Sequence, residues 1–197
     1  MNSAITLSII ILTTMISTMA KSSSPEPNCE DLSPNFSVGA DIGAFSHGGK
    51  SFLMSSVSGN CRITIEAWSK SIPDSFTDLN EDNKGEGWKR DITRGYSLHL
   101  DTFYGSADTG WYSGMVFSHS RSEISRKGYE EKIAARTNEI LLKFGYKWSV
   151  TDHLSIDPWF GFGPVWDKID GTAIGGEFYE KNLGNALLSL QMTFSFD

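Results

Sequence analysis

The residues best suited to catalysis lie in the run 117–123, Phe-Ser-His-Ser-Arg-Ser-Glu. A histidine can act as a base toward a serine hydroxyl, and a carboxylate can orient its imidazole. His119, Ser120 and Glu123 are therefore the candidate catalytic residues. If the run is a strand, however, His119 and Ser120 point to opposite faces, and a serine from another strand is needed. The competing interpretation is a polar strand end without chemistry.

The remaining histidines offer weaker candidates for chemistry. His47, His99 and His153 are scattered singly, without the close spacing of a metal-ligand cluster. We therefore expect no metal site and no cofactor. The formal net charge of −7 also argues against a nucleic-acid partner, because a phosphate-binding surface needs clustered Lys and Arg.

The N-terminal residues resemble an export signal rather than part of a fold. Residues 1–20 contain an apolar run and end in small residues before Lys21, which is typical of a cleavable signal peptide. Residues 21–34, rich in Ser, Pro and acids, predict a flexible segment, and residues 35–197 a single domain. In an exported chain, Cys29 and Cys61 are expected to form one disulfide. Two independent thiols are the alternative.

Most of the mature chain alternates between apolar and polar residues with a period of two, which predicts strands. The apolar faces of these segments lack Asp, Glu, Lys and Arg, whereas the opposite faces are small, polar or charged. The predicted strands are 35–45, 51–57, 62–68, 96–104, 111–118, 139–148, 154–163 and 188–196. Alternation alone does not show which face is inside.

The connections between these strands help to choose the orientation. Connections 58–60, 105–109 and 149–153 are short, whereas 71–91, 123–136 and 167–185 are long. Short and long connections that alternate are typical of a membrane barrel, whose apolar face meets lipid. Aromatic residues also gather at the ends of the predicted strands next to the short connections, as expected at a lipid headgroup boundary: Tyr104, Trp111, Tyr146 and Trp148.

With this orientation, the charged faces fill the barrel. The interior of an eight-stranded barrel is just wide enough for side chains, so we expect no aqueous channel. Isolated ions are costly in such a place, which predicts a paired polar network. Its expected members are Asp41, Arg62, Glu66, His99, Asp101, Glu139, Lys143, Lys147 and Asp157.

The chain resembles the small eight-stranded outer-membrane β-barrel proteins in its signal, its alternating strands and its last segment. That segment, Leu-Ser-Leu-Gln-Met-Thr-Phe-Ser-Phe-Asp, is similar to the aromatic C-terminal strand that outer-membrane assembly machinery reads, although Asp197 follows the last Phe. The resemblance implies an all-β, antiparallel up-and-down transmembrane barrel of about eight strands. It also implies export through the periplasm to the bacterial outer membrane, as a monomer in contact with membrane lipid, lipopolysaccharide and the assembly machinery.

Three functions remain open from the sequence. The leading hypothesis is a non-enzymatic barrel with an envelope-structural or surface-interaction role. The second is a barrel enzyme that modifies lipid A, since the run 117–123 resembles the chemistry of such enzymes. The third is a soluble lipocalin-like binding protein, in which the apolar faces point inward and line a ligand cavity.

Overall fold

The structure, a computed structural model, describes residues 35–72, 77–78, 80–105, 109–170, 173–180 and 184–196. The predicted signal peptide 1–20, the segment 21–34 and Asp197 lie outside the described residues. Cys29 lies there too, so its disulfide with Cys61, the first residue of a strand, stays a prediction.

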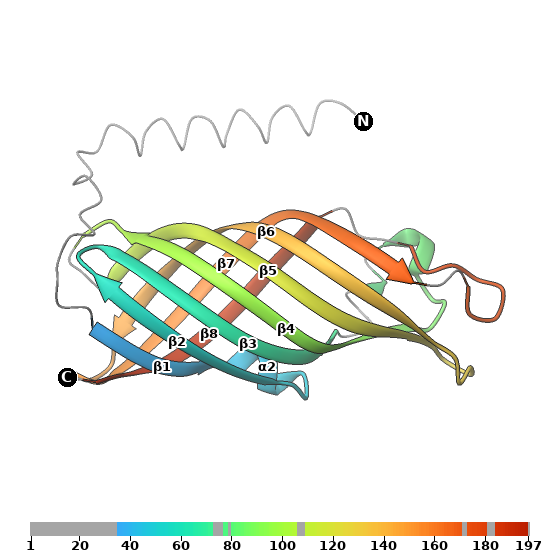
Figure 1. Cartoon of the computed structure of the whole chain (residues 1–197), viewed down its shortest axis with the longest axis horizontal. Helices are drawn as coiled ribbons and strands as arrows, with labels where there is room; N and C mark the ends of the chain where they lie inside the picture. Colours follow the sequence, from blue (N-terminus) through green and yellow to red (C-terminus); the bar gives the residue numbers. More distant parts are fainter. Residues whose placement is uncertain are drawn as a thin grey trace, which may run out of the picture.

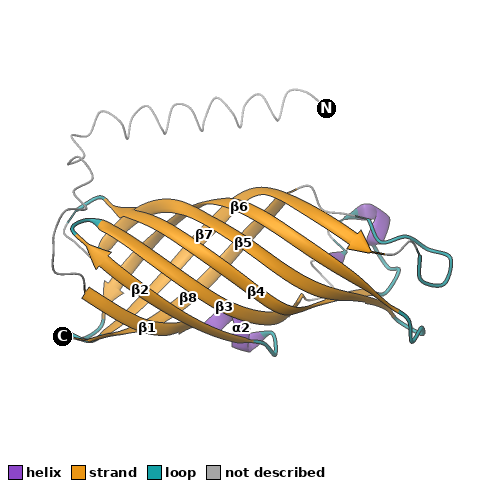
Figure 2. Cartoon of the chain, in the orientation of Figure 1, coloured by secondary structure: helices purple, strands orange, loops and turns teal. Residues whose placement is uncertain are grey.

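Eight antiparallel strands follow one another in sequence order around a closed barrel, and β1 pairs with β8 to close it (Figures 1 and 2). The strands are β1 (Asn35–Asp41), β2 (Lys50–Ser58), β3 (Cys61–Ile72), β4 (Trp88–Phe103), β5 (Gly110–Arg126), β6 (Lys132–Ser149), β7 (Leu154–Asp170) and β8 (Gly184–Phe196). This order confirms the predicted up-and-down topology. In the described ranges, no helix is both long and apolar enough to cross a membrane.

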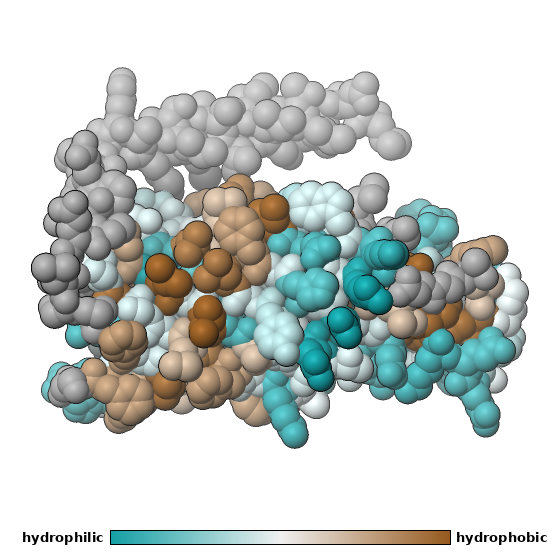
Figure 3. All heavy atoms as spheres, in the orientation of Figure 1, coloured by the Kyte–Doolittle hydropathy of each residue, from teal (hydrophilic) through white to brown (hydrophobic). Residues whose placement is uncertain are grey.

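The two ends of the barrel differ in their connections. We call the end where β2 meets β3, β4 meets β5 and β6 meets β7 the turn end, and the opposite end the loop end. Near the turn end, outward side chains are apolar, while Arg62, Asp101 and Lys143 point inward and are buried. On the visible face of Figure 3, apolar side chains gather over the half nearer the turn end, and hydrophilic ones over the other half.

The first strand is shorter than predicted. It ends at Asp41, and the short helix α2 (Ile42–Ser46) replaces the expected strand residues up to Phe45. The Asp41 carboxylate accepts a hydrogen bond from the Gly43 backbone N–H at 2.8 Å, which caps the helix. Ala44 on this helix is buried. Local capping and burial therefore override the alternation at this point.

The long connections are shorter than predicted, because strands extend into all three of them. β4 begins at Trp88, β5 ends at Arg126, β6 begins at Lys132 and β7 ends at Asp170. Period two continues in these extensions, but the polarity of the faces is exchanged. Ile124, Ile133 and Ala135 point inward and pack with Trp88. Because the strands were predicted with their apolar residues on the outer face, these extensions were not recognised as strands.

This exchange gives the loop end an apolar core of its own. The core consists of Trp88, Ile124, Ile133, Ala135, Ile174 and Tyr179. The Trp88 and Tyr179 rings meet edge to face, with centroids 5.6 Å apart. In the remaining connection between β3 and β4, a 3-10 helix, η1 (Glu81–Asn83), contributes the buried Asn83 side chain, which donates to the Glu180 carbonyl. The loop end is therefore packed like a water-soluble domain.

Candidate functional site

Inside the barrel near the turn end, β3, β4, β6 and β7 bring together a buried ion network. Arg62 lies at its centre, donating from Nη2 to Asp101 Oδ2 at 2.8 Å and from Nη1 to Asp157 Oδ2 at 2.7 Å. Lys143 Nζ lies 3.1 Å from the same Asp101 oxygen. All four side chains are excluded from solvent. The network therefore joins strands that are far apart in the chain.

Aromatic rings enclose this network. The Arg62 guanidinium lies 4.6 Å from the Tyr112 ring centroid and 5.2 Å from that of Phe103. The Tyr112 hydroxyl donates to Asp157 Oδ1 at 2.6 Å. Gly145 on the neighbouring strand makes room for this ring, since a Cβ at that position would lie 2.3 Å from the Tyr112 oxygen. The missing side chain at residue 145 thus lets the tyrosine reach the carboxylate.

The network continues toward β2 through an imidazole. Lys143 Nζ lies 3.2 Å from His99 Nδ1 and, as an ammonium, can only donate to it. A neutral His99 ring then carries its proton on Nε2, which lies 3.4 Å from Glu66 Oε2 without hydrogen-bond geometry. Ser51 donates to the other Glu66 oxygen at 2.6 Å.

Two of the predicted network residues, Asp41 and Glu139, have their side-chain hydrogen bonds outside this connected group. Asp41 caps α2, and Glu139 accepts a hydrogen bond from Asn185 at 3.2 Å. Lys147 is buried on the inward face of β6. The arrangement is one of paired charges in a filled interior, and its carboxylates are engaged by cations, hydroxyls or amide groups.

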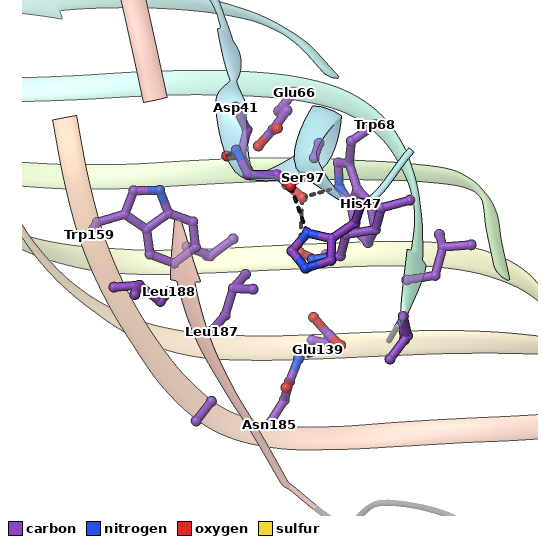
Figure 4. A pocket seen from close by; sticks show the side chains of 18 of the residues that line it. Asp41, His47, Glu66, Trp68, Ser97, Glu139, Trp159, Asn185, Leu187 and Leu188 are labelled. Carbon is purple, nitrogen blue, oxygen red and sulfur yellow. Dashed lines mark hydrogen bonds between the residues drawn. The ribbon is translucent and has the colours of Figure 1, made fainter. Parts of the chain in front are cut away.

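A cavity of about 180 Å³ lies beside the network on its loop-end side (Figure 4). Glu66, Trp68, Ser97 and His99 line its inner wall, where the Trp68 Nε1–H donates to Ser97 Oγ at 2.9 Å. Leu188 also lines it, although 78% of this residue is exposed. The cavity therefore reaches the barrel wall where β8 faces α2.

The ladder that closes the barrel is short at this place. Pairing between β1 and β8 runs only from Phe36 opposite Phe196 to Asp41 opposite Gln191. Beyond Asp41, the chain turns into α2, which packs against β8. The part of β8 from Gly184 to Leu190 is therefore hydrogen-bonded to β7 but has no ladder partner on β1.

The candidate catalytic residues are not brought together. His119 faces outward, where its Nδ1 lies 2.9 Å from Asn138 Oδ1, while Ser120 is buried in the interior. Glu123 also faces outward and forms an ion pair with Lys132 at 2.7 Å. Within the described ranges, no group of His, Cys, Asp and Glu side chains has the arrangement of a metal site.

A second buried network near the loop end was missed by sequence reasoning. Arg90 donates from Nε to Ser122 Oγ at 3.0 Å and from both Nη atoms to Asp167, at 3.0 and 2.9 Å. The Thr137 hydroxyl contacts both Arg90 and Asp167. The predicted connections 71–91 and 167–185 contained Arg90 and Asp167. Alternation that continues through residues 133–137 is the signal that could have extended the strands.

Comparisons with known proteins give a distant structural likeness. No known family description matches the chain, and no curated protein sequence matches it. Among solved structures, it is similar to a major outer membrane protein from Thermus thermophilus, with 13% sequence identity and a TM-score of 0.47. The match covers 83% of this chain and 100% of the other. No residue role is transferred at this level of similarity.

Proposed function

We propose that this chain is a non-enzymatic protein of the bacterial outer membrane. In this proposal, the barrel spans the membrane with an interior filled by side chains and serves envelope structure, while the loop end projects outward and contacts surfaces. The outward apolar side chains contact lipid and lipopolysaccharide. The chain acts as a monomer after insertion by the outer-membrane assembly machinery.

The observation that carries this proposal is the exchange of polarity along single strands. On β6 near the turn end, Leu142 and Phe144 are exposed outward while Lys143 is fully buried inside. Farther along the same strand, Ile133 is buried inside and Lys132 is exposed. A water-soluble protein has no reason to reverse its faces within one strand. A barrel that leaves a bilayer must do so, because lipid and water select opposite outer surfaces.

The strand lengths support the same placement. β5 has 17 residues and β6 has 18. At about 3.3 Å per residue and a tilt of about 40°, such a strand rises by about 45 Å, whereas the apolar band of a membrane barrel is about 25 Å tall. The strands are therefore long enough to cross the bilayer and to continue into water at the loop end.

Orientation follows from the two ends. Short turns lie on the periplasmic side of membrane barrels and longer connections outside. At the turn end, the rings of Trp111, Tyr146 and Trp148 contact one another, with centroids 5.0 and 4.8 Å apart. Such amphipathic rings favour the headgroup region. We therefore assign the turn end to the periplasm.

The two alternatives fit the geometry less well. A lipocalin-like binder needs an apolar inward face, but Arg62, Asp101 and Lys143 occupy the inward positions at the level of the apolar band. A lipid A-modifying enzyme needs His119 beside a serine of another strand, but the residues directly opposite His119 on β4 and β6 are Tyr96 and Asn138.

Heat modifiability tests the proposal. The membrane fraction is extracted in detergent, and electrophoretic mobility is compared with and without boiling. We expect membrane-bound protein whose mobility shifts only after boiling, together with an unchanged lipid A mass in cells that produce it. Full solubility without detergent would contradict the membrane placement, and an altered lipid A mass that depends on His119 would favour the enzyme.

A further inference from the structure

The outer surface of β4 to β7 carries a row of cationic side chains. Strand register places Arg94 opposite Arg121, Arg121 opposite Arg136, and Arg136 opposite Lys168. All four residues are exposed on the outside of the barrel. We call them the cationic row. Because consecutive members lie directly opposite one another, the row concentrates positive charge on one strip of the wall.

This arrangement is unfavourable in the absence of a counter-ion. Like charges directly opposite on adjacent antiparallel strands have Cβ atoms about 5 Å apart and destabilise the sheet. The nearest outward acids on β4 and β5 are Asp91 and Glu123, and both contact lysines outside the row, at 3.3 and 2.7 Å. Arg136 also has a contact within the chain. Arg94 and Arg121, which lie directly opposite each other, are therefore the members of the row best suited to mutation.

The cationic row lies where a membrane surface is expected. The next outward positions toward the turn end form a polar and aromatic row in the same register. This row consists of Tyr96, His119, Asn138 and Trp166. One position farther, Leu98, Phe117 and Ile140 form an apolar row. Tyr and Trp favour the interface between hydrocarbon and water. The cations therefore follow directly after that interface, at the depth of lipid headgroups.

We propose that the cationic row binds the phosphate groups of a phosphorylated glycolipid in the outer leaflet, the lipopolysaccharide of the membrane assigned above. This inference rests on the proposed function, because only a chain inserted in that membrane brings the row to the headgroups. Guanidinium groups match phosphate oxygens with two parallel hydrogen bonds, and the ion pairs remove the repulsion within the row. The bound phosphates thus act as counter-ions for the aligned charges.

The test uses the full chain reconstituted in phosphatidylcholine vesicles that contain purified bisphosphorylated lipid A. The variant R94S/R121S removes two neighbouring charges from the row. The control K84S/K127S removes two exposed charges that lie outside it. After extraction in detergent, the lipid A retained by each protein is quantified by mass spectrometry. Heat modifiability of each variant confirms that the barrel is folded.

We expect R94S/R121S to retain lipid A at least about tenfold less than the unchanged chain, and K84S/K127S to retain it equally. Dephosphorylated lipid A should be retained weakly by all three proteins. Equal retention by R94S/R121S, or equal retention of dephosphorylated lipid A, would overturn the inference. Competition by millimolar inorganic phosphate would also overturn it and indicate a site for soluble anions. If the unchanged chain is soluble without detergent, the proposed function itself fails. A heat-modifiable barrel that does not retain lipid A in preference to its dephosphorylated form would reject only the binding site at the cationic row.

Discussion

Asp101 holds two buried cations at once, because one of its oxygens accepts from Arg62 and also contacts Lys143. Removing one member of a buried pair leaves an uncompensated charge, which costs more than the pair contributes. We therefore expect Asp101→Asn to lower the free energy of unfolding by about 3 to 5 kcal/mol. Urea unfolding in lipid vesicles, followed by tryptophan fluorescence, measures the change.

A double variant separates the effect of the uncompensated charge from the effect of packing. Adding Lys143→Met to Asp101→Asn removes one orphaned cation, while Arg62 keeps its bond to Asp157. We expect the double variant to recover part of the lost stability. Exposed Asp152, replaced by Asn, is the control and should change little. A double variant less stable than Asp101→Asn alone would contradict the charge explanation.

Gly145 serves the same network through its missing side chain. A methyl group there would meet the Tyr112 hydroxyl, so Gly145→Ala should displace the ring from Asp157 and cost about 1 to 3 kcal/mol. Gly105→Ala is the matched control, because nothing lies within 4 Å of its added Cβ. The same unfolding experiment compares the two, and an equal effect would show that the Tyr112 contact does not matter.

At the scale of elements, the closure of the barrel is uneven. β1 and β8 pair only between Phe36 and Asp41, whereas β4 and β5 pair from Trp88 to Phe103. Local opening depends on how many contacts and hydrogen bonds an element must lose. We expect hydrogen exchange by mass spectrometry to show faster exchange in β1 and in residues 184–190 than in β4, β5 and β6. Uniform protection around the barrel would contradict this prediction.

At the scale of the whole molecule, the proposed membrane placement predicts which outward positions tolerate charge. Leu142 and Ala134 are both exposed on the outer face of β6, but Leu142 lies in the apolar part and Ala134 near the loop end. We expect Leu142→Lys to cost about 2 to 4 kcal/mol in lipid vesicles and Ala134→Lys about 0 to 1 kcal/mol. Unfolding in phosphatidylcholine vesicles tests the pair. Equal costs would place both positions in the same solvent.

The eight strands could be predicted because each of them repeats with period two, as in 139–148 and 188–196. The inward positions of Arg62, Asp101 and Lys143 follow from this alternation together with the alternating short and long connections. Two features were not predicted from the sequence. They are α2, where the Asp41 cap ends β1, and the strand extensions, where the faces exchange polarity. Both depend on surroundings that a local pattern does not contain.

The sequence by itself determined which side chains of a strand share a face, since alternation is a property of a single strand. Only the tertiary structure decided which residues of different strands lie opposite one another. The Arg62 contacts with Asp101 and Asp157, and the alignment of the cationic row, depend on register. Register is set by hydrogen bonding around the closed wall and by irregularities such as the shift between Ile92 and Arg94, which no single strand encodes.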